Sequence, residues 1–399
     1  MYEKLRKLQD ADIKGKTVVV RVNYDVPLSG SQEILDVTRI ESSLETIKYL
    51  HKNECKIVLV SHLGRPGGEE VDELSLMPVR FELGKLLNMP IKFAHINACE
   101  NSIKFMEPQE IILLENLRFH KGEESSKAEE REEFIKVLSD LCDVYVNEAF
   151  GVYREHASVF ELAQSLPSYA GFEFQKEIEH LSKLEDVTEK PYIAVIGGKK
   201  MDTKIPLLKH LVKKVDKLLI GGAMAYTFLK AQGVNVGKSL VEDECIKDAK
   251  EIFELAKKSS CEIILPVDHI CSSELKEDGV SVEVNTQHIP DDLFGLDIGP
   301  RTLEDFREII EAARTILWNG PMGVFEWEQY NRGTEAIGEY IALAAPKESF
   351  KVAGGADTTY AINLLKIKPK RFNHISIGGG MMLKFLSGQE FKVINVLCD

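Results

Sequence analysis

Short apolar segments that end in tight turns recur along the whole chain and alternate with charged segments of helical spacing. Examples of the apolar kind are "TVVVRVNY", "KIVLVSH", "PYIAVIGG" and "FKVAGGAD", and examples of the charged kind are "SSLETIKYLHKN" and "KAEEREEFIKVLSDL". A near-continuous apolar run is typical of a strand that is buried on both faces of a parallel sheet. The alternation therefore predicts an α/β fold with helices packed on both sides of the sheet.

The turns after these strands differ between the two halves of the chain. Strands of the first half end in polar or charged residues, whereas strands of the second half end in paired or tripled glycines. Between them, residues 172–191 read as one charged amphipathic helix that is closed by Pro191. Because 399 residues suffice for two domains, we expect one domain over residues 1–171, a connecting helix, and a second domain after it.

Composition narrows the range of partners and compartments. The net charge of −14 opposes nonspecific binding to nucleic acid, which requires a basic face. The seven cysteines are scattered and form no C-x-x-C pair, as expected for free thiols in a reducing compartment. The N-terminal "MYEKLRKLQDADI" does not resemble a secretory signal, and no apolar run approaches the roughly 20 residues that span a bilayer. We therefore expect a cytoplasmic protein that binds neither nucleic acid nor membrane.

The segment "GVNVGKS" at residues 233–239 comes within one residue of a phosphate-binding P-loop. A P-loop needs four residues between its first glycine and the Gly-Lys-Ser end, and it leads from a strand into a helix. Here there are three such residues, and Gly233 follows the helical pattern of "MAYTFLKAQ". The segment is interpreted as a helix C-cap followed by a turn.

Basic residues follow the predicted strands of the first half. In open α/β sheets, ligands bind beyond the carboxyl ends of the strands. These positions, together with an early loop, hold Arg21, Asn23, Arg39, His62, Arg65, Arg118, Arg154 and His156. Each arginine alone has a second explanation as a surface charge or structural ion pair, and each histidine as a core hydrogen-bonding group. Gathered at one edge of a sheet, the arginines predict a small ligand with more than one negative group.

Glycine-rich turns follow the strands of the second half, in "VIGGKK", "LIGGAMA", "VAGGADTT" and "SIGGGMM". One such turn is an ordinary tight connection, but four at helix starts indicate a phosphate-rich ligand. None fits G-x-G-x-x-G, which argues against a nicotinamide-dependent dehydrogenase. Lys200 and Lys204 are four residues apart and would share one face if the segment is helical; the alternative is that both are solvated surface lysines. Asp357 and Thr358 would either cap the following helix or hold magnesium beside phosphates.

With both sets of residues assembled, the chain resembles phosphoglycerate kinase over essentially its full length. The resemblance is carried by "SHLGRP", "LLENLRF", "NEAFG", "REHAS", "GGAMAYTFLKAQG", "LPVD", "LWNGPMGVFEW" and "GGADT". It implies two doubly wound, Rossmann-like parallel-sheet domains joined by a hinge helix at 172–191. The N-terminal domain, with residues 381–399 returning to it, would bind phosphoglycerate, and residues 192–380 would bind the nucleotide. The implied reaction transfers a phosphoryl group from 1,3-bisphosphoglycerate to ADP, giving ATP and 3-phosphoglycerate.

The resemblance also implies roles for individual residues. On the phosphoglycerate side it implies Asn23, Asp25, Arg39, His62, Arg65, Arg118 and Arg154. On the nucleotide side it implies Lys200, Lys204, Gly299, Glu326, Gly354, Gly355, Asp357 and Thr358. Arg39 and Lys200 would contact the transferring phosphoryl group, Glu326 the ribose, and Asp357 the Mg²⁺ that accompanies ATP or ADP. Both nucleophiles are ionised near pH 7, so no general base is required. We expect a monomer whose domains close around the two substrates.

Several positions depart from the family pattern. The usual "RVDFNVP" reads "RVNYDVP", which exchanges aspartate and asparagine as Asn23 and Asp25. "VYREH" replaces "AHRAH", Ala356 stands where glycine is usual, Lys199 replaces an aliphatic residue, and Lys384 replaces a glutamate. These changes leave a second hypothesis open, that of a phosphoglycerate-binding paralogue with little or no turnover.

Overall fold

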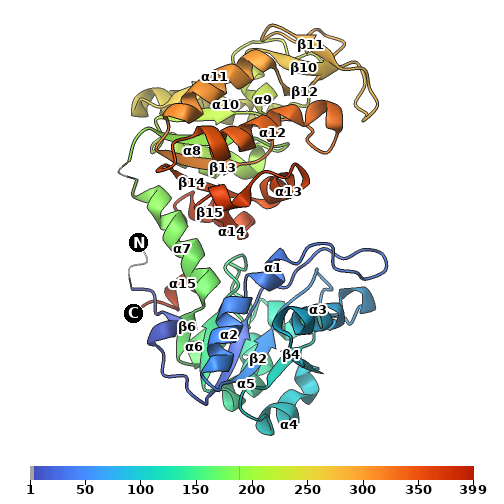
Figure 1. Cartoon of the computed structure of the whole chain (residues 1–399), viewed down its shortest axis with the longest axis vertical. Helices are drawn as coiled ribbons and strands as arrows, with labels where there is room; N and C mark the ends of the chain where they lie inside the picture. Colours follow the sequence, from blue (N-terminus) through green and yellow to red (C-terminus); the bar gives the residue numbers. More distant parts are fainter. Residues whose placement is uncertain (1–3, 188) are drawn as a thin grey trace. The chain divides into compact units, whose positions relative to one another are not determined.

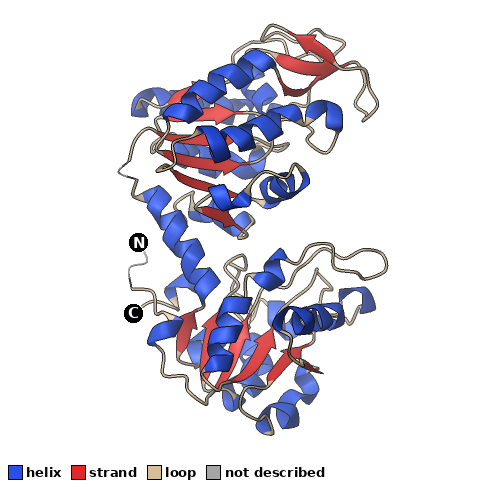
Figure 2. Ribbon diagram, viewed as in Figure 1, coloured by secondary structure: helices blue, strands red, loops and turns tan. Residues whose placement is uncertain are grey.

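The computed structural model describes residues 4–187 and 189–399, and the chain divides into two compact units. Unit 1 comprises Met1–Glu179 together with Glu390–Asp399, and unit 2 comprises His180–Gln389. Each unit is built on a parallel sheet with helices packed against it (Figures 1 and 2). This arrangement confirms the predicted fold class of two doubly wound α/β domains.

Unit 1 contains a six-stranded sheet in the order β3-β4-β2-β1-β5-β6, with every pair parallel. Its strands are β1 (Thr17–Arg21), β2 (Lys56–Val60), β3 (Lys92–Ala94), β4 (Ile111–Leu114), β5 (Val144–Asn147) and β6 (Ser168–Ala170). Its helices are α1 (Thr38–Glu41), α2 (Leu44–Lys52), α3 (Met77–Leu87), α4 (Cys99–Lys104), α5 (Ala128–Leu141), α6 (Glu161–Ser165) and α15 (Lys392–Asn395). Helix α7 (Phe172–Glu185) begins in unit 1 and ends in unit 2, and it ends before the predicted residue 191. Of the predicted returning segment 381–399, only Glu390–Asp399 belongs to unit 1.

The four inner strands of unit 1 explain the apolar runs of the sequence. All residues of β4 and β5, and all but the first of β1 and β2, are buried, as expected for strands covered on both faces. The two edge strands, β3 and β6, are only three residues long and carry no such run. The sequence pattern therefore identified the inner strands but not the edges.

Unit 2 contains a six-stranded parallel sheet in the order β15-β14-β13-β7-β8-β9. Its strands are β7 (Tyr192–Ile196), β8 (Lys217–Ile220), β9 (Glu262–Ile264), β13 (Thr315–Asn319), β14 (Phe350–Gly354) and β15 (His374–Ser376). Its helices are α8 (Ile205–Leu211), α9 (Met224–Ala231), α10 (Ile246–Ser259), α11 (Pro300–Ala312), α12 (Arg332–Glu339), α13 (Ala356–Leu364) and α14 (Gly380–Phe385). The strand order reverses between β7 and β13, and such a switch point is where open α/β sheets bind ligands.

Unit 2 also contains an antiparallel sheet that the sequence pattern did not predict. Its strands are β10 (His269–Ser272), β11 (Val282–Val284) and β12 (Phe294–Ile298), paired in the order β11-β10-β12. Strand β11 is largely exposed, so its sequence lacks the apolar run that marks a buried strand. Within the described ranges, no helix is both long and apolar enough to cross a membrane.

Candidate functional site

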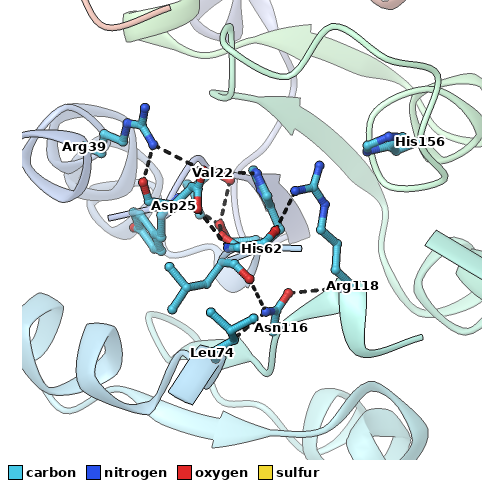
Figure 3. A network of polar contacts seen from close by, with 12 residues as sticks. Val22, Asp25, Arg39, His62, Leu74, Asn116, Arg118 and His156 are labelled. Carbon is cyan, nitrogen blue, oxygen red and sulfur yellow. Dashed lines mark hydrogen bonds and ion pairs between the residues drawn. The ribbon is translucent and has the colours of Figure 1, made fainter. Parts of the chain in front are cut away.

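The strands of unit 1 end in register at one edge of the sheet. Arg21, the last residue of β1, lies opposite Val60 of β2 and Asn147 of β5. The segments that follow β1, β2 and β4 therefore start at the same level, and they bring Asp25, His62 and Arg118 together with Arg39 of α1 (Figure 3). This edge is where the sequence predicted an anion-binding region.

Asp25 links three of these segments. Its Oδ1 accepts a hydrogen bond from the backbone N–H of Gly64 at 2.9 Å, and its Oδ2 lies 3.6 Å from Nη1 of Arg39. Nη1 of Arg39 also donates to the backbone carbonyl of Asp25. Nε2 of His62 lies 4.0 Å from the same Oδ2. The carboxylate that replaces the family asparagine is thus an internal partner of Arg39.

His62 is buried and neutral. Burial, followed by the charges of Arg21 and Arg118, holds its pKa well below the ordinary value of 6.5. Its Nδ1 lies 3.1 Å from Nη2 of Arg21. Because a guanidinium group only donates hydrogen bonds, Nδ1 is the acceptor and the proton is on Nε2. His62 therefore presents an N–H donor on the side of Asp25 and Arg39.

Arg21 itself has a structural role, contrary to its inclusion among the anion-binding arginines. Its side chain is fully buried, and its Nε donates to Ser158 Oγ at 2.7 Å. It also donates to the carbonyl of Val22, and its Nη2 lies 3.9 Å from the buried carboxylate of Glu123. A guanidinium group that is surrounded in this way holds its neighbours in place but cannot reach a ligand.

Asn116 orients the loop that carries His62 and Arg65, a role that the sequence pattern did not indicate. Its amide donates to the carbonyls of Leu63 at 2.7 Å and Leu74 at 2.9 Å, while its Oδ1 accepts from the N–H of Arg118 at 3.1 Å (Figure 3). Nη1 of Arg118 in turn donates to the carbonyl of Gly64 at 2.8 Å. One buried amide therefore fixes the segments after β2 and β4 to each other.

The remaining predicted residues of unit 1 keep free hydrogen-bonding capacity. Arg65 and Arg154 are exposed, and neither forms an ion pair with any residue that the structure describes. Arg65 is close enough to Arg118 to lower the pKa of that group, although burial is the larger cause. The Oδ1 atom of Asn23 is buried without a hydrogen-bond partner. Unpartnered donors and acceptors at one edge of a sheet are what a polar ligand would satisfy.

Two residues near Arg154 have other partners. Glu155 does not neutralise Arg154, because its Oε2 lies 3.1 Å from Nζ of Lys392 in α15. His156 is buried with Nε2 3.4 Å from Glu124, and burial together with nearby arginines lowers its pKa to about 3. Both arrangements are structural.

In unit 2, the glycine turns after β7, β8 and β13 press against one another at the switch point. A Cβ atom on Gly197 would come 2.1 Å from the carbonyl of Pro321, and one on Gly222 would come 2.4 Å from the amide nitrogen of Gly198. A Cβ atom on Gly320 would come 2.3 Å from the carbonyl of Gly197. These glycines are therefore needed for close approach between loops, in addition to any approach of a ligand.

Lys204 lies over this junction. Its Nζ donates to the carbonyl of Gly197 and would come 2.7 Å from a Cβ atom on Gly320. Burial lowers its pKa to about 8, and the nearby Asp357 opposes that shift. Within the described chain no carboxylate comes within ion-pair distance of it, so its charge is available to a bound anion.

Lys200 and Lys204 do not share a helix face, contrary to the prediction. Lys200 lies in an exposed loop, Lys204 ends the short 3₁₀ helix Asp202–Lys204, and α8 begins only at Ile205. Pro206 explains the late start, because proline is favoured in the first turn of a helix and disfavoured further inside.

A cavity of about 780 Å³ opens beside the switch point, which is the size expected for a small-molecule site. Its apolar walls include Tyr226, Phe294, Leu296 and Val324. Its polar lining includes Gly198, Lys199, Lys238, Glu326 and Asp357. Glu326 and Asp357 are both exposed and unpaired within the described residues. Two of the predicted nucleotide residues therefore line one cavity.

The start of α13 holds three further predicted residues. Gly355 has φ = 99°, which favours glycine, whereas Ala356 is already helical, so the departure at Ala356 imposes no backbone strain. Thr358 is buried, and its Oγ1 accepts the N–H of Gly320 at 2.7 Å. Gly354 is packed against Met382. Thr358 and Gly354 thus position the turn without lining the cavity.

Gly299 lies outside the cavity lining. It is the N-cap residue of α11, and a Cβ atom there would come within 2.3 Å of the Asp268 carboxyl carbon. That carboxylate caps α11 by accepting the N–H groups of Arg301 at 2.9 Å and Thr302 at 2.8 Å. A glycine is therefore needed at position 299 to leave room for the carboxylate of Asp268, which caps α11. The glycine of this segment that lines the cavity is Gly295.

The segment "GVNVGKS" has the predicted turn but also a position that the prediction missed. Gly233 has φ = 85° and ends the helix region after α9, as a C-cap glycine does. Lys238 lines the cavity, with its Nζ 5.8 Å from the centre of the Phe294 ring. The lysine of the near-P-loop thus belongs to the cavity although the segment is not a P-loop. Long-range pairing places it there, through Val236 with Ile289 and through the N–H of Lys238, which donates to the carbonyl of Leu293 at 2.8 Å.

The fold and these residues together define an α/β protein with arginines gathered at the sheet edge of one unit and a cavity of about 780 Å³ at a glycine switch point in the other. The phosphoglycerate kinase family model matches residues 8–389. The chain is 45% identical to a phosphoglycerate kinase of Thermosipho africanus over 395 residues, which cover 97% of this chain and 96% of the relative. It is 44% identical to a phosphoglycerate kinase of Dictyoglomus turgidum, with 98% of each covered. This chain belongs to the phosphoglycerate kinase family.

Solved structures agree with this assignment. The structure of phosphoglycerate kinase from Coxiella burnetii matches with a TM-score of 0.87 at 34% identity, with 98% of each chain covered. The enzyme from Pyrococcus horikoshii OT3 matches with a TM-score of 0.85 at 31% identity, also with 98% of each chain covered.

Proposed function

We propose that this protein catalyses the reversible transfer of a phosphoryl group from 1,3-bisphosphoglycerate to ADP, giving ATP and 3-phosphoglycerate. Family membership over residues 8–389 carries the proposal. The two sites support it, because the substrates of this reaction are two polyanions of different kinds. We place the reaction in the cytoplasm and expect the protein to act as a monomer.

The proposed chemistry needs positioning and charge neutralisation rather than proton transfer. The attacking group is a carboxylate in one direction and a phosphate oxygen in the other, and both are ionised near pH 7. In agreement, His62 is held neutral and its Nδ1 is occupied by Arg21, so it serves as a hydrogen-bond donor and not as a base. Cationic donors aimed at the migrating group stabilise the transition state in such reactions.

Each site would bind one substrate. Phosphoglycerate would be held by Asn23, Arg39, His62, Arg65, Arg118 and Arg154 of unit 1, and Asp25 would act on it only through its ion pair with Arg39. The nucleotide would occupy the cavity of unit 2, with its ribose at Glu326 and its phosphates near Lys204, Gly354, Gly355 and Thr358; Gly299 would act only indirectly, through α11. Arg39 and Lys200 would contact the transferring phosphoryl group.

The residues of the cavity fit a magnesium ion that arrives with the nucleotide. Mg²⁺ is commonly held by one or two carboxylates together with substrate phosphates, not by a complete protein cage. In line with this, no group of three or more His, Cys, Asp or Glu ligands occurs among the described residues, while Asp357 offers one unpaired carboxylate in the cavity lining. Bound there, the ion would neutralise charge on the phosphates.

The two proposed sites belong to separate units, so the reacting atoms must be brought to within about 3 to 3.5 Å of each other. We therefore propose closure of the domains about the 172–191 segment, which contains α7. Closure would also keep water away from the acyl phosphate.

A coupled assay with ATP, Mg²⁺ and 3-phosphoglycerate tests the proposal. We expect turnover in the parent protein and a fall in kcat of about 100-fold or more in Arg39→Ala and Lys200→Ala. Arg307→Ala and Lys213→Ala remove exposed cations elsewhere in unit 2 and should leave kcat unchanged. Binding of 3-phosphoglycerate without turnover would instead support the paralogue hypothesis, which the internal Asp25–Arg39 pair favours.

A further inference from the structure

A second cavity, of about 390 Å³, lies in unit 2 beside the start of β14. Its volume falls within the range of small-molecule sites, roughly 300 to 1,000 Å³. Four cationic side chains line it, and none of its lining residues is acidic. These cations are Lys347, Lys351, Lys370 and Arg371. In a chain with a net charge of −14, such a concentration of positive charge needs a physical reason.

Lys351 is the central feature of this cavity. The residue is only 4% exposed, and the single hydrogen bond of its ammonium group within the described chain is a long one of 3.3 Å from Nζ to the carbonyl of Ala345. An ammonium group has three donors, so two remain without a protein partner among the described residues. Burial, followed by the charge of Arg371, lowers the pKa of this lysine, whereas Glu348 opposes the shift. A buried cation with unused donors is costly unless an anion joins it.

The other three cations are also unpaired. Lys347, Lys370 and Arg371 are exposed, and none forms an ion pair with a residue in the described part of the chain. Glu348 is the neighbouring carboxylate, but it lies outside the lining and forms no ion pair with any of them. No carboxylate among the described residues therefore forms an ion pair with the side chains that repel each other around this cavity.

The cavity has a fixed frame. Asn373 accepts the backbone N–H of Lys351 at 2.8 Å with its Oδ1, and its own N–H donates to the Lys351 carbonyl at 2.9 Å. Phe372, which forms part of the wall, stacks on the buried ring of Trp318 with 6.3 Å between ring centres. The strand start that carries Lys351 and the wall opposite are thus held by the core of unit 2, which pre-organises the cationic groups.

We propose that this cavity binds a small, multiply charged phosphate compound through Lys347, Lys351, Lys370 and Arg371. The guanidinium fork and the ammonium groups suit phosphate oxygens, and the buried Lys351 supplies the innermost contact. The site is distinct from the nucleotide cavity, because Lys351 lies near the start of β14 whereas Asp357 follows the end of that strand. The inference goes beyond the proposed function and does not depend on it.

Lysine acetylation rates, measured residue by residue with mass spectrometry, test the proposal on the full-length protein. The probes are inorganic phosphate and pyrophosphate, each compared with sodium chloride at equal ionic strength. We expect pyrophosphate to slow acetylation of Lys347 and Lys370 at least about threefold, with a smaller effect for phosphate and none for chloride. Equal protection by chloride, or no protection, would overturn the proposal.

Variants separate this cavity from the nucleotide site. Arg371→Gln changes an exposed residue, and Lys351→Met keeps the volume of the buried chain; either should abolish protection of Lys347 and Lys370. The matched control Lys368→Ala removes an exposed lysine outside the lining and should preserve it. Persistence of protection in Arg371→Gln would contradict the proposal even if Lys351→Met does not fold. Variants of Lys200 and Lys204 test the nucleotide site separately. If the proposed function fails in those tests, the inference about this second cavity still stands.

Discussion

Nη2 of Arg21 donates a hydrogen bond to Nδ1 of His62, 3.1 Å away, and both side chains are buried. This contact fixes the tautomer of the histidine, because the guanidinium group cannot accept. We expect His62 to remain neutral with its proton on Nε2 between pH 5 and pH 8, since burial and Arg21 keep its pKa well below 6.5. Long-range ¹⁵N–¹H correlation spectra measure this directly. A titration near pH 6.5, or a proton on Nδ1, would contradict it.

The same contact predicts which substitution His62 tolerates. A glutamine amide can place its N–H group near the position of Nε2, whereas the shorter asparagine amide overlaps Nδ1. We therefore expect His62→Gln to raise the KM for 3-phosphoglycerate less than His62→Asn, by a factor of at least about 5, or roughly 1 kcal/mol. Steady-state kinetics at pH 7 check this. Equal losses in the two variants would mean that the Nε2 donor is not used.

The Asp25–Arg39 pair predicts an increase in affinity on removal of a carboxylate. Asp25 Oδ2 lies 3.6 Å from Arg39 Nη1 and competes with any anion for that cation. Asp25→Asn should lower the KM for 3-phosphoglycerate about 3- to 10-fold, which corresponds to roughly 1 kcal/mol for a partly exposed pair. Glu41→Gln, which removes an exposed carboxylate from the same helix as Arg39, is the control and should leave KM unchanged. A higher KM in Asp25→Asn would show instead that Asp25 binds the substrate.

Lys204 predicts a pH limit on nucleotide use. Its pKa is lowered to about 8 by burial, so the ammonium charge is present below that pH and is lost as pH rises through it. The kcat/KM for ATP should therefore decrease above about pH 8. Lys204→Met should lower kcat/KM for ATP by about 100-fold or more at pH 7. The variant should also lose the decrease in kcat/KM above about pH 8. An unchanged profile in the variant would assign the decrease to another group.

Whether the sequence predicts a given strand depends on how completely that strand is buried. Strands β1, β2, β4 and β5 are covered on both faces, and therefore each is a recognisable apolar run. Strands β3 and β11 are three residues long and partly exposed, so their pairing is decided by tertiary contacts and leaves no periodic signal. Local pattern thus identifies the interior of each sheet but not its margins.

The gathering of polar and cationic side chains at one edge of the sheet of unit 1 was predictable because parallel strands end there, but the partners of each side chain were not. Arg21 ends one strand and Arg118 follows another. Arg21 is nevertheless occupied by Ser158, which is 137 residues away in the sequence, and Nε of Arg118 lies 3.0 Å from Glu124. Lys238 was likewise assigned to a turn because its place in the cavity depends on Phe294. Long-range partners of this kind determine whether a cation is structural or available, and no local pattern contains them.

Glu148 anchors the first turn of α7 and predicts how stability depends on pH. Its carboxyl oxygens accept the N–H groups of Glu173 at 3.2 Å and Phe174 at 3.3 Å, as well as the hydroxyl of Thr46. Burial nevertheless dominates and raises its pKa from 4.5 to about 8. The folded state therefore binds a proton more tightly than the unfolded state does. This contribution is fully present below about pH 4.5 and is lost as pH rises toward 8.

Urea unfolding of the parent protein and of Glu148→Gln at pH 5, 6.5 and 8 isolates this contribution. The glutamine cannot ionise, so the free energy of unfolding of the parent relative to the variant should decrease with rising pH, by at most about 1.4 kcal/mol per pH unit. Glu133→Gln, which removes an exposed carboxylate from α5, is the control that should keep the slope of the parent. A relative stability that stays constant from pH 5 to pH 8 would mean that Glu148 is ionised in the folded protein, with the N–H groups of α7 outweighing its burial.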